Sequence, residues 1–90
     1  MIDLLDNGIT ALGCEFIGQA VQSPFCRVLQ LKLDNNLILS EGLKHLAIGL
    51  RQNKILDKLS LKYCGINEQG AKYLQEILAN IGSRLRSLKL

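Results

Sequence analysis

Long apolar runs, a basic N-terminal segment and a C-x-x-C pair are missing from this 90-residue sequence, and each absence excludes a class of protein. No stretch approaches the ~20 consecutive apolar residues that a membrane-spanning helix requires. The sequence starts Met-Ile-Asp-Leu-Leu-Asp, and because it has no basic region there we expect no secretory signal. The formal net charge of +3 is well below the basicity typical of dedicated nucleic-acid-binding domains. What remains is one small folded unit, 48% of it hydrophobic.

The cysteine count is odd, with Cys14, Cys26 and Cys64 at irregular spacing. We expect three buried, unreactive thiols rather than a disulfide framework. Together with the missing secretory signal, this pattern indicates a reducing, intracellular and cytoplasmic location.

Catalytic motifs are absent as well. The sequence contains no G-x-S-x-G, no H-E-x-x-H and no phosphate-binding glycine loop. His45 is the single histidine, and we expect it to be an exposed helix residue rather than a metal ligand. The sequence therefore predicts neither an enzyme nor a cofactor or metal site.

A repeat of 28 or 29 residues dominates what is present. Its first column holds Ile2, Leu31, Leu59 and Leu88. The other columns are equally similar in chemistry: Leu4, Leu33, Leu61 and Leu90; Asn7, Asn36 and Cys64; Ile9, Ile38 and Ile66; Gly13, Gly42 and Gly70; Ile17, Leu46 and Leu74; Val21, Leu50 and Leu78.

The spacing inside one unit predicts its structure. Leu31-Lys32-Leu33 alternates apolar and polar residues, which is typical of a short strand with one buried face. From Ile38 the apolar positions recur every four residues to Leu50, which predicts an α-helix. We therefore expect an α/β fold of three strand–turn–helix units, at about 1–27, 28–55 and 56–84, followed by the strand of a fourth unit at 85–90.

Several residues have predicted structural roles. Thr10, Ser40 and Asn67 are expected to accept hydrogen bonds from the first turns of the three helices. The glycine column is expected to mark close contact between neighbouring helices, with no room for a Cβ atom. Asn7 and Asn36 are expected to satisfy backbone groups of stacked turns, with Cys64 as a weakly polar replacement. Three aromatic residues are expected to pack between units: Phe16, Phe25 and Tyr73.

The pattern L-x-x-L-x-L-x-x-(N/C)-x-I resembles the leucine-rich repeat signature. It is present as Val28-Leu31-Leu33-Asn36-Ile38 and again as Leu56-Leu59-Leu61-Cys64-Ile66. The repeat length, the glycine in the helix and the Asn-or-Cys turn resemble the ribonuclease-inhibitor subclass, which includes the repeat domains of NOD-like receptors and Ran GTPase-activating protein. This resemblance implies a horseshoe-shaped solenoid, with parallel strands on a concave face and helices on the convex face. It also implies that further repeats or a neighbouring subunit cover the two ends, so that the chain is part of a longer solenoid.

The concave face is the predicted binding surface, because polar residues between the buried leucines point toward it. One flank starts at Leu5, and Tyr63 follows the third strand as a candidate aromatic anchor. The predicted partner-binding residues are Gln30, Lys32, Asp34, Lys58, Ser60, Lys62, Tyr63, Ser87 and Lys89. The basic C-terminal half of this set predicts a protein partner with an acidic surface, and no small molecule, nucleic acid or membrane.

Two other functions stay open at this point. One is a purely architectural role in a larger assembly, such as a filament, a ribonucleoprotein or a ciliary complex. The other is a GTPase-activating fragment, since the resemblance includes such a protein. The strand-to-helix loops contain no arginine, and this makes the second alternative the weaker one.

Overall fold

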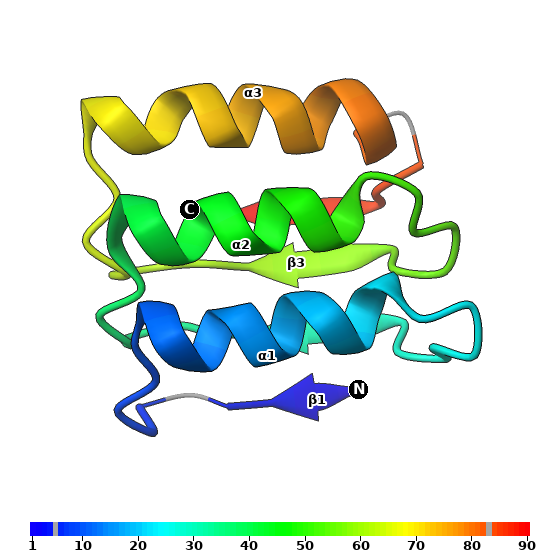
Figure 1. Cartoon of the computed structure of the whole chain (residues 1–90), viewed down its shortest axis with the longest axis horizontal. Helices are drawn as coiled ribbons and strands as arrows, with labels where there is room; N and C mark the ends of the chain where they lie inside the picture. Colours follow the sequence, from blue (N-terminus) through cyan, green and yellow to red (C-terminus); the bar gives the residue numbers. More distant parts are fainter. Residues whose placement is uncertain (5, 83) are drawn as a thin grey trace.

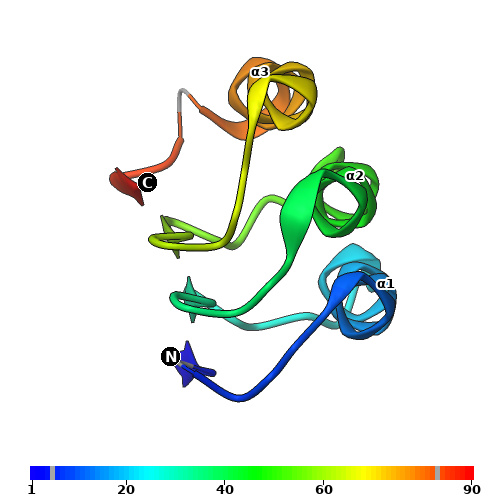
Figure 2. The same cartoon turned by 90° about the vertical axis from the view of Figure 1, so that its left-hand side faces the viewer.

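The computed structural model describes residues 1–4, 6–82 and 84–90, and within these residues the chain forms four strands and three helices. Strands alternate with helices along the chain (Figure 1). The elements are β1 (Ile2–Asp3), α1 (Ala11–Gln22), β2 (Gln30–Lys32), α2 (Leu39–Leu50), β3 (Lys58–Ser60), α3 (Glu68–Ile81) and β4 (Ser87–Lys89). The helices lie on one side of the sheet and leave its other side open (Figure 2). We call this other side the open face.

The sheet is parallel throughout, in the order β1-β2-β3-β4. Ile2 pairs with Leu31, Leu31 with Leu59, and Leu59 with Leu88. These pairs are the first column of the sequence repeat, so the strands pair in the register of the repeat, and the predicted α/β class with parallel strands is confirmed. Parallel strands need a long crossover connection, and each helix provides one.

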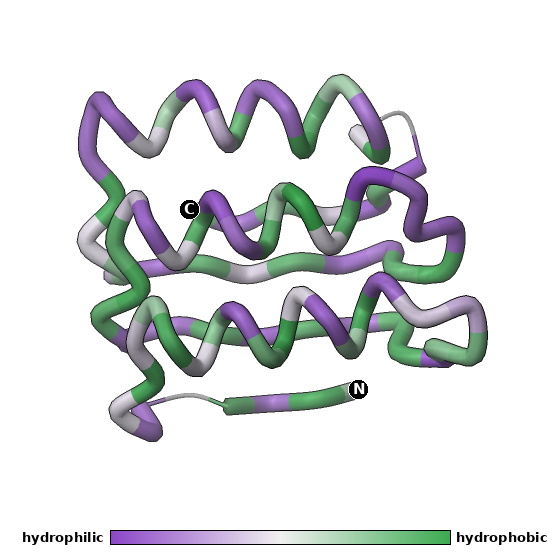
Figure 3. Tube along the Cα trace, in the orientation of Figure 1, coloured by the Kyte–Doolittle hydropathy of each residue, from purple (hydrophilic) through white to green (hydrophobic). Residues whose placement is uncertain are grey.

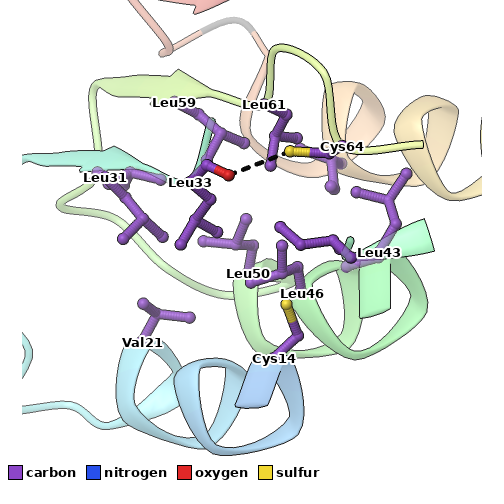
Figure 4. Packing of buried hydrophobic residues seen from close by; sticks show 14 of the residues in the cluster. Cys14, Val21, Leu31, Leu33, Leu43, Leu46, Leu50, Leu59, Leu61 and Cys64 are labelled. Carbon is purple, nitrogen blue, oxygen red and sulfur yellow. Dashed lines mark hydrogen bonds between the residues drawn. The ribbon is translucent and has the colours of Figure 1, made fainter. Parts of the chain in front are cut away.

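The core lies between the sheet and the helices. Hydrophobic residues alternate with polar ones along the strands and recur at intervals along the helices (Figure 3). Leucines of β2, β3 and the turns that follow them point toward leucines of α2, with Cys14 and Val21 of α1 beside them (Figure 4). Replacing one such leucine by alanine should cost about 2–5 kcal/mol.

The three helices begin in different ways, and two of the three predicted caps are wrong. Asn67 accepts hydrogen bonds from the N–H groups of Gln69 and Gly70, as predicted. Thr10 occupies the N-cap position of α1 but makes no side-chain cap bond. Ser40 lies inside α2, and its hydroxyl donates to Asn67 Oδ1 at 2.7 Å instead. The second and third units are therefore linked at their helix starts.

Each turn after a strand contains a residue in the left-handed backbone region. These residues are Asp6, Asn35 and Tyr63, with φ angles of 55°, 58° and 58°. They occupy one repeat column, immediately before the Asn7/Asn36/Cys64 column. Asp and Asn adopt this conformation readily, whereas a tyrosine pays a steric cost of about 1–2 kcal/mol there.

The glycine column requires a correction. A Cβ atom on Gly42 would lie 2.6 Å from Ile38 Cγ2, and one on Gly70 would lie 2.7 Å from Ile66 Cγ2. The tightest contact therefore comes from the isoleucine one turn earlier in the same unit, and the neighbouring helix is a second, looser contact.

The close helix–helix contact lies elsewhere, between α1 and α2. A Cβ atom on Gly49 would overlap the backbone of Gly18, with the Gly18 Cα only 2.7 Å away. A Cβ atom on Gly18 would lie 2.6 Å from the carbonyl oxygen of His45. Because both neighbours are backbone atoms, the two helices could accept a side chain at Gly49 only by moving apart.

Two of the aromatic residues expected to pack between units are exposed instead. Phe16 is 62% exposed on α1 and Phe25 is 82% exposed in the following loop. Tyr73 packs against the core as predicted. Cys14 and Cys64 are buried, whereas Cys26 is only half-buried, so the expectation of three buried thiols holds for two of them.

Candidate partner-binding face

A shallow groove crosses the open face of the sheet over β2, β3 and β4. Its volume is about 200 Å³. Eight of the nine predicted partner-binding residues line it, together with the edges of Leu31 and Leu59: Gln30, Lys32, Asp34, Lys58, Ser60, Lys62, Ser87 and Lys89. The ninth, Tyr63, lies outside the groove. Leu5, on the predicted flank, lies outside the described residues.

Ser60 is at the centre of this groove and is not available to a partner in the way we expected. It is only 6% exposed, and its hydroxyl donates to Asp34 Oδ1 at 2.6 Å. The same carboxylate oxygen accepts the backbone N–H of Lys62 at 2.9 Å. Asp34 therefore connects the end of β2 to the end of β3 and fixes the shape of the groove floor.

The asparagine column joins the turns that follow the strands. Asn36 is 2% exposed, and its Nδ2 donates to the carbonyl oxygens of Leu4 and Leu33, each at 2.9 Å. Its Oδ1 accepts from the N–H groups of Asn7 and Ile9 at 2.9 and 3.0 Å. The predicted role of Asn36 is confirmed, because these bonds join the first turn to the second. Asn7 itself is exposed and contributes its backbone.

Cys64 occupies the third position of that column. Its thiol donates to the carbonyl oxygen of Leu33 at 3.1 Å (Figure 4). Burial raises the pKa of this thiol, and the nearby Asp34 carboxylate raises it further, although hydrogen bonds to the backbone lower it in part. Burial also raises the pKa of Cys14 to about 11, with a smaller contribution from Cys64. The thiolate is the reactive form of cysteine, and a raised pKa leaves little of it at neutral pH. Both thiols therefore have a structural role.

Tyr63 lies where the third strand turns toward α3. It is 83% exposed and adjoins a second hollow of about 390 Å³. This hollow is mainly apolar and is lined by Leu61, Tyr63, Cys64, Gly65, Ile66, Asn67, Ala71, Leu74 and Leu90. It opens at the end of the stack rather than on the open face, so Tyr63 and the groove present two separate surfaces.

Asn53 and Arg84 are structural residues that the repeat pattern did not predict. Asn53 Nδ2 donates to the Val21 carbonyl at 2.8 Å, and its Oδ1 accepts the N–H groups of Ile55 and Leu56. Arg84 donates to the carbonyl oxygens of Asn53 and Leu56. They link the C-terminal end of α1 to the two helix-to-strand loops that follow α2 and α3. The one feature of the sequence that sets this region apart is the helix-to-strand loop between Leu50 and Leu56, which is shorter than the corresponding loops of the other units.

The described residues give no direct support for metal chemistry. His45 pairs with Glu41 one turn earlier on α2, at 3.5 Å. Within the described parts of the chain, no three His, Cys, Asp or Glu residues come together as a metal-binding group. Among the same residues, no helix is long and apolar enough to cross a membrane.

Repeated strand–turn–helix units on a parallel sheet, with one face left open, define the class of protein to which this chain is similar. No protein-family model matches the chain. The chain is 33% identical over 89 residues to the mouse protein "NACHT, LRR and PYD domains-containing protein 12". This match covers 99% of the chain but only 8% of the length of the mouse protein. The similarity supports repeats of the leucine-rich type, in line with the repeat columns of the sequence.

Proposed function

We propose that this chain is a segment of a leucine-rich repeat solenoid of the ribonuclease-inhibitor type, which binds another protein through the open face of its sheet. The observation that carries this proposal is the groove, because the residues that line it come from three strands in register. Short parallel strands held by hydrogen bonds form a rigid array, and a partner can bind it with little ordering cost. The name of the mouse relative includes leucine-rich repeats.

The proposal also includes the cellular compartment of the chain and the absence of a catalytic role. The odd cysteine count favours a reducing, intracellular compartment. We assign no catalytic role to the chain, and we keep the unit boundaries at about 28, 56 and 85 as predictions.

The test uses a variant whose side chain fills the groove without changing its charge. Ser87 lines the groove and pairs in register with Lys58. In the Ser87→Trp variant a bulky ring should fill the β4 side of the groove and weaken partner binding at least tenfold, because the partner could no longer pack closely against the groove. The matched control is Gln69→Trp, which places the same ring on an exposed position of α3.

The partner is first captured with the full-length protein, and its affinity for each purified variant is then measured by calorimetry. Circular dichroism shows whether both variants fold. If Gln69→Trp weakens binding more than Ser87→Trp, the partner binds the helix side and the proposal is wrong.

An architectural role is the second candidate, and the exposed apolar residues at the ends of the stack favour it. Leu12 and Phe16 are exposed on α1, and the second hollow opens beside Leu90. If this role is correct, the chain should associate through these ends at micromolar concentration, as measured by light scattering. A Leu12→Glu/Phe16→Glu variant should remain monomeric. A wild-type chain that stays monomeric at high concentration would exclude this candidate.

A further inference from the structure

Four lysines of the groove surround Ser60. Lys32 on β2 and Lys89 on β4 pair with Ser60 in register, so each lies one strand away. Lys58 precedes Ser60 by two residues and Lys62 follows it by two, and both line the groove. With strands about 4.8 Å apart and residues about 3.3 Å apart along a strand, the four stems rise from a patch on the order of 10 by 13 Å. We call these four residues the lysine ring.

The charge inside the ring is only partly neutralised. The groove lining contains four lysines and one carboxylate, Asp34, so its formal charge is 4 − 1 = +3. Asp34 Oδ1 already accepts two hydrogen bonds. Asp3 pairs in register with Lys32 and weakens the field of that lysine.

The other three members of the ring carry most of the positive field. Within the described residues, the ion pairs join His45 to Glu41, Arg51 to Glu76 and Arg86 to Asp57. None of these pairs involves Lys58, Lys62 or Lys89. The positive charge of these three side chains is therefore available to a partner.

We propose that the lysine ring is the receptor for a cluster of carboxylates, formed by two or three Asp or Glu side chains on the surface of the protein partner. This inference rests on the proposed function, because it names the chemistry that the groove selects. Placing carboxylates among several ammonium groups gives electrostatic complementarity and speeds association. The neutral side chains of Gln30 and Ser87 line the same groove and can hydrogen-bond the polar surroundings of such a cluster.

The composition of the groove favours carboxylates over phosphates. Arginine is the residue that matches phosphate with two parallel hydrogen bonds. All four arginines of this chain, Arg27, Arg51, Arg84 and Arg86, lie in the helix-to-strand loops and outside the groove. The described groove lining also contains no aromatic ring on which a nucleobase could stack. A nucleic acid would thus find lysines here, but neither a paired-hydrogen-bond partner for its phosphates nor a ring on which its bases could stack.

The first experiment uses an eight-residue glutamate peptide, with a phosphoserine peptide of equal length and an eight-nucleotide thymidine strand for comparison. Each is titrated at low ionic strength into the isotopically labelled chain, and amide shifts are recorded by NMR. We expect the glutamate peptide to shift the amides of residues 30–34, 58–62 and 87–89. Tighter binding of the phosphoserine peptide or the thymidine strand would overturn the inference.

Two triple variants with the same change of net charge test the ring. Lys58→Gln/Lys62→Gln/Lys89→Gln removes three ring charges, and Lys44→Gln/Lys54→Gln/Lys72→Gln removes three exposed charges outside the groove. The first should weaken glutamate-peptide binding about tenfold, because each exposed pair contributes a fraction of the 1.4 kcal/mol that corresponds to a factor of ten. The second should change it less than twofold. Equal weakening by both triples means that only the net charge acts, and the inference is then wrong.

The captured partner separates this inference from the proposed function. If Ser87→Trp blocks the partner while the ring triple leaves its affinity unchanged, the open face is still the binding surface but carboxylate recognition is wrong. If neither variant affects the partner, both proposals are wrong. Loss of affinity in both variants supports both.

Discussion

Asn36 offers the sharpest test of how the turns are held together. The Asn36→Ala change removes the side-chain amide that bonds the first turn to the second. This amide lies within hydrogen-bond distance of five backbone groups: the carbonyl oxygens of Leu4, Leu33 and Asp34 and the N–H groups of Asn7 and Ile9. Because the two hydrogens of Nδ2 are shared among three carbonyl oxygens, the network counts as about four hydrogen bonds. At about 1 kcal/mol per net hydrogen bond the loss is roughly 4 kcal/mol, and partial access of water to the first turn reduces it to about 3–4 kcal/mol.

Two other asparagines provide a graded comparison. Asn53 is also buried and makes three hydrogen bonds, so Asn53→Ala should cost about 2–3 kcal/mol. Asn67 is exposed and caps α3, so Asn67→Ala should cost about 1 kcal/mol. The Asn36→Cys variant imitates the natural residue of the third turn. Because a thiol donates one hydrogen bond and accepts poorly, it should recover only part of the loss.

Urea denaturation followed by circular dichroism measures all four variants, and the slope of the transition shows whether the unfolded state has changed. A small domain has only about 5–15 kcal/mol of stability, so Asn36→Ala should shift the midpoint strongly or leave the chain unfolded. The order Asn36, Asn53, Asn67 is the essential result. If Asn36→Ala costs no more than Asn67→Ala, the stacked turns do not depend on this hydrogen-bond network, and the argument is refuted.

Three further predictions follow from other parts of the chain. Gly49→Ala should destabilise the fold by about 1–3 kcal/mol, because its Cβ would overlap the backbone of Gly18. The better helix propensity of alanine should not offset this overlap. A neutral or stabilised variant in urea unfolding would show that the helices separate easily. The pKa of Cys14 is raised from 9.0 to about 11 in the folded state, so the contribution of its protonated thiol to stability is fully present below pH 9. Roughly 2–3 kcal/mol of the free energy of unfolding should be lost as the pH rises from 9 to 11. Cys14→Ala should reduce the alkaline loss to the part that Cys64 contributes, whereas Cys26→Ala should leave the larger loss in place. Equal pH profiles for the two variants would contradict the assignment. Tyr63→Asn should raise the melting temperature, because asparagine tolerates a φ of 58°. The expected gain in the free energy of unfolding is about 1 kcal/mol. A lower melting temperature would mean that the exposed ring makes stabilising contacts.

The sequence was sufficient for the strands and their register. Leu31 and Leu59 alternate with polar residues, and a one-residue slip would move every leucine to the open face, so such a slip is excluded. The other columns of the repeat then select the observed pairing. The groove could be predicted for the same reason, since its residues are the polar partners of this alternation. Asn36 was predictable because a buried turn requires side-chain partners for its backbone.

The helix starts depend on contacts between units, and the sequence of one unit does not contain them. Leu39 adopts a φ of 61° at the start of α2, and its side chain lies against Gly65 of the next turn. This arrangement places Ser40 within the helix and leaves it without a capping position. Thr10 has the residue type and position of a cap, yet its side chain makes no cap bond, so composition alone overstates such interactions.

Burial of individual polar and aromatic residues was also set by neighbours. Ser60 was predicted to be accessible because it alternates with leucines, but Asp34 reaches across from the adjacent strand and holds its hydroxyl. Phe16 was predicted to pack between units. Its side chain is instead 62% exposed on α1, so no described unit covers it.

The backbone contact between Gly18 and Gly49 has a consequence for the shape of the open face. Backbone hydrogen bonds keep neighbouring strands at a nearly constant spacing of about 4.8 Å, so the angle between successive units depends on how far apart their helices lie. Two glycines let α1 approach α2 more closely than larger side chains would allow. We therefore expect a narrower wedge between the first two units and a flatter sheet there. A partner that spans all four strands would then have to match a surface whose curvature changes along its length. A side chain introduced at either glycine should push the two helices apart and bend that surface without touching the groove.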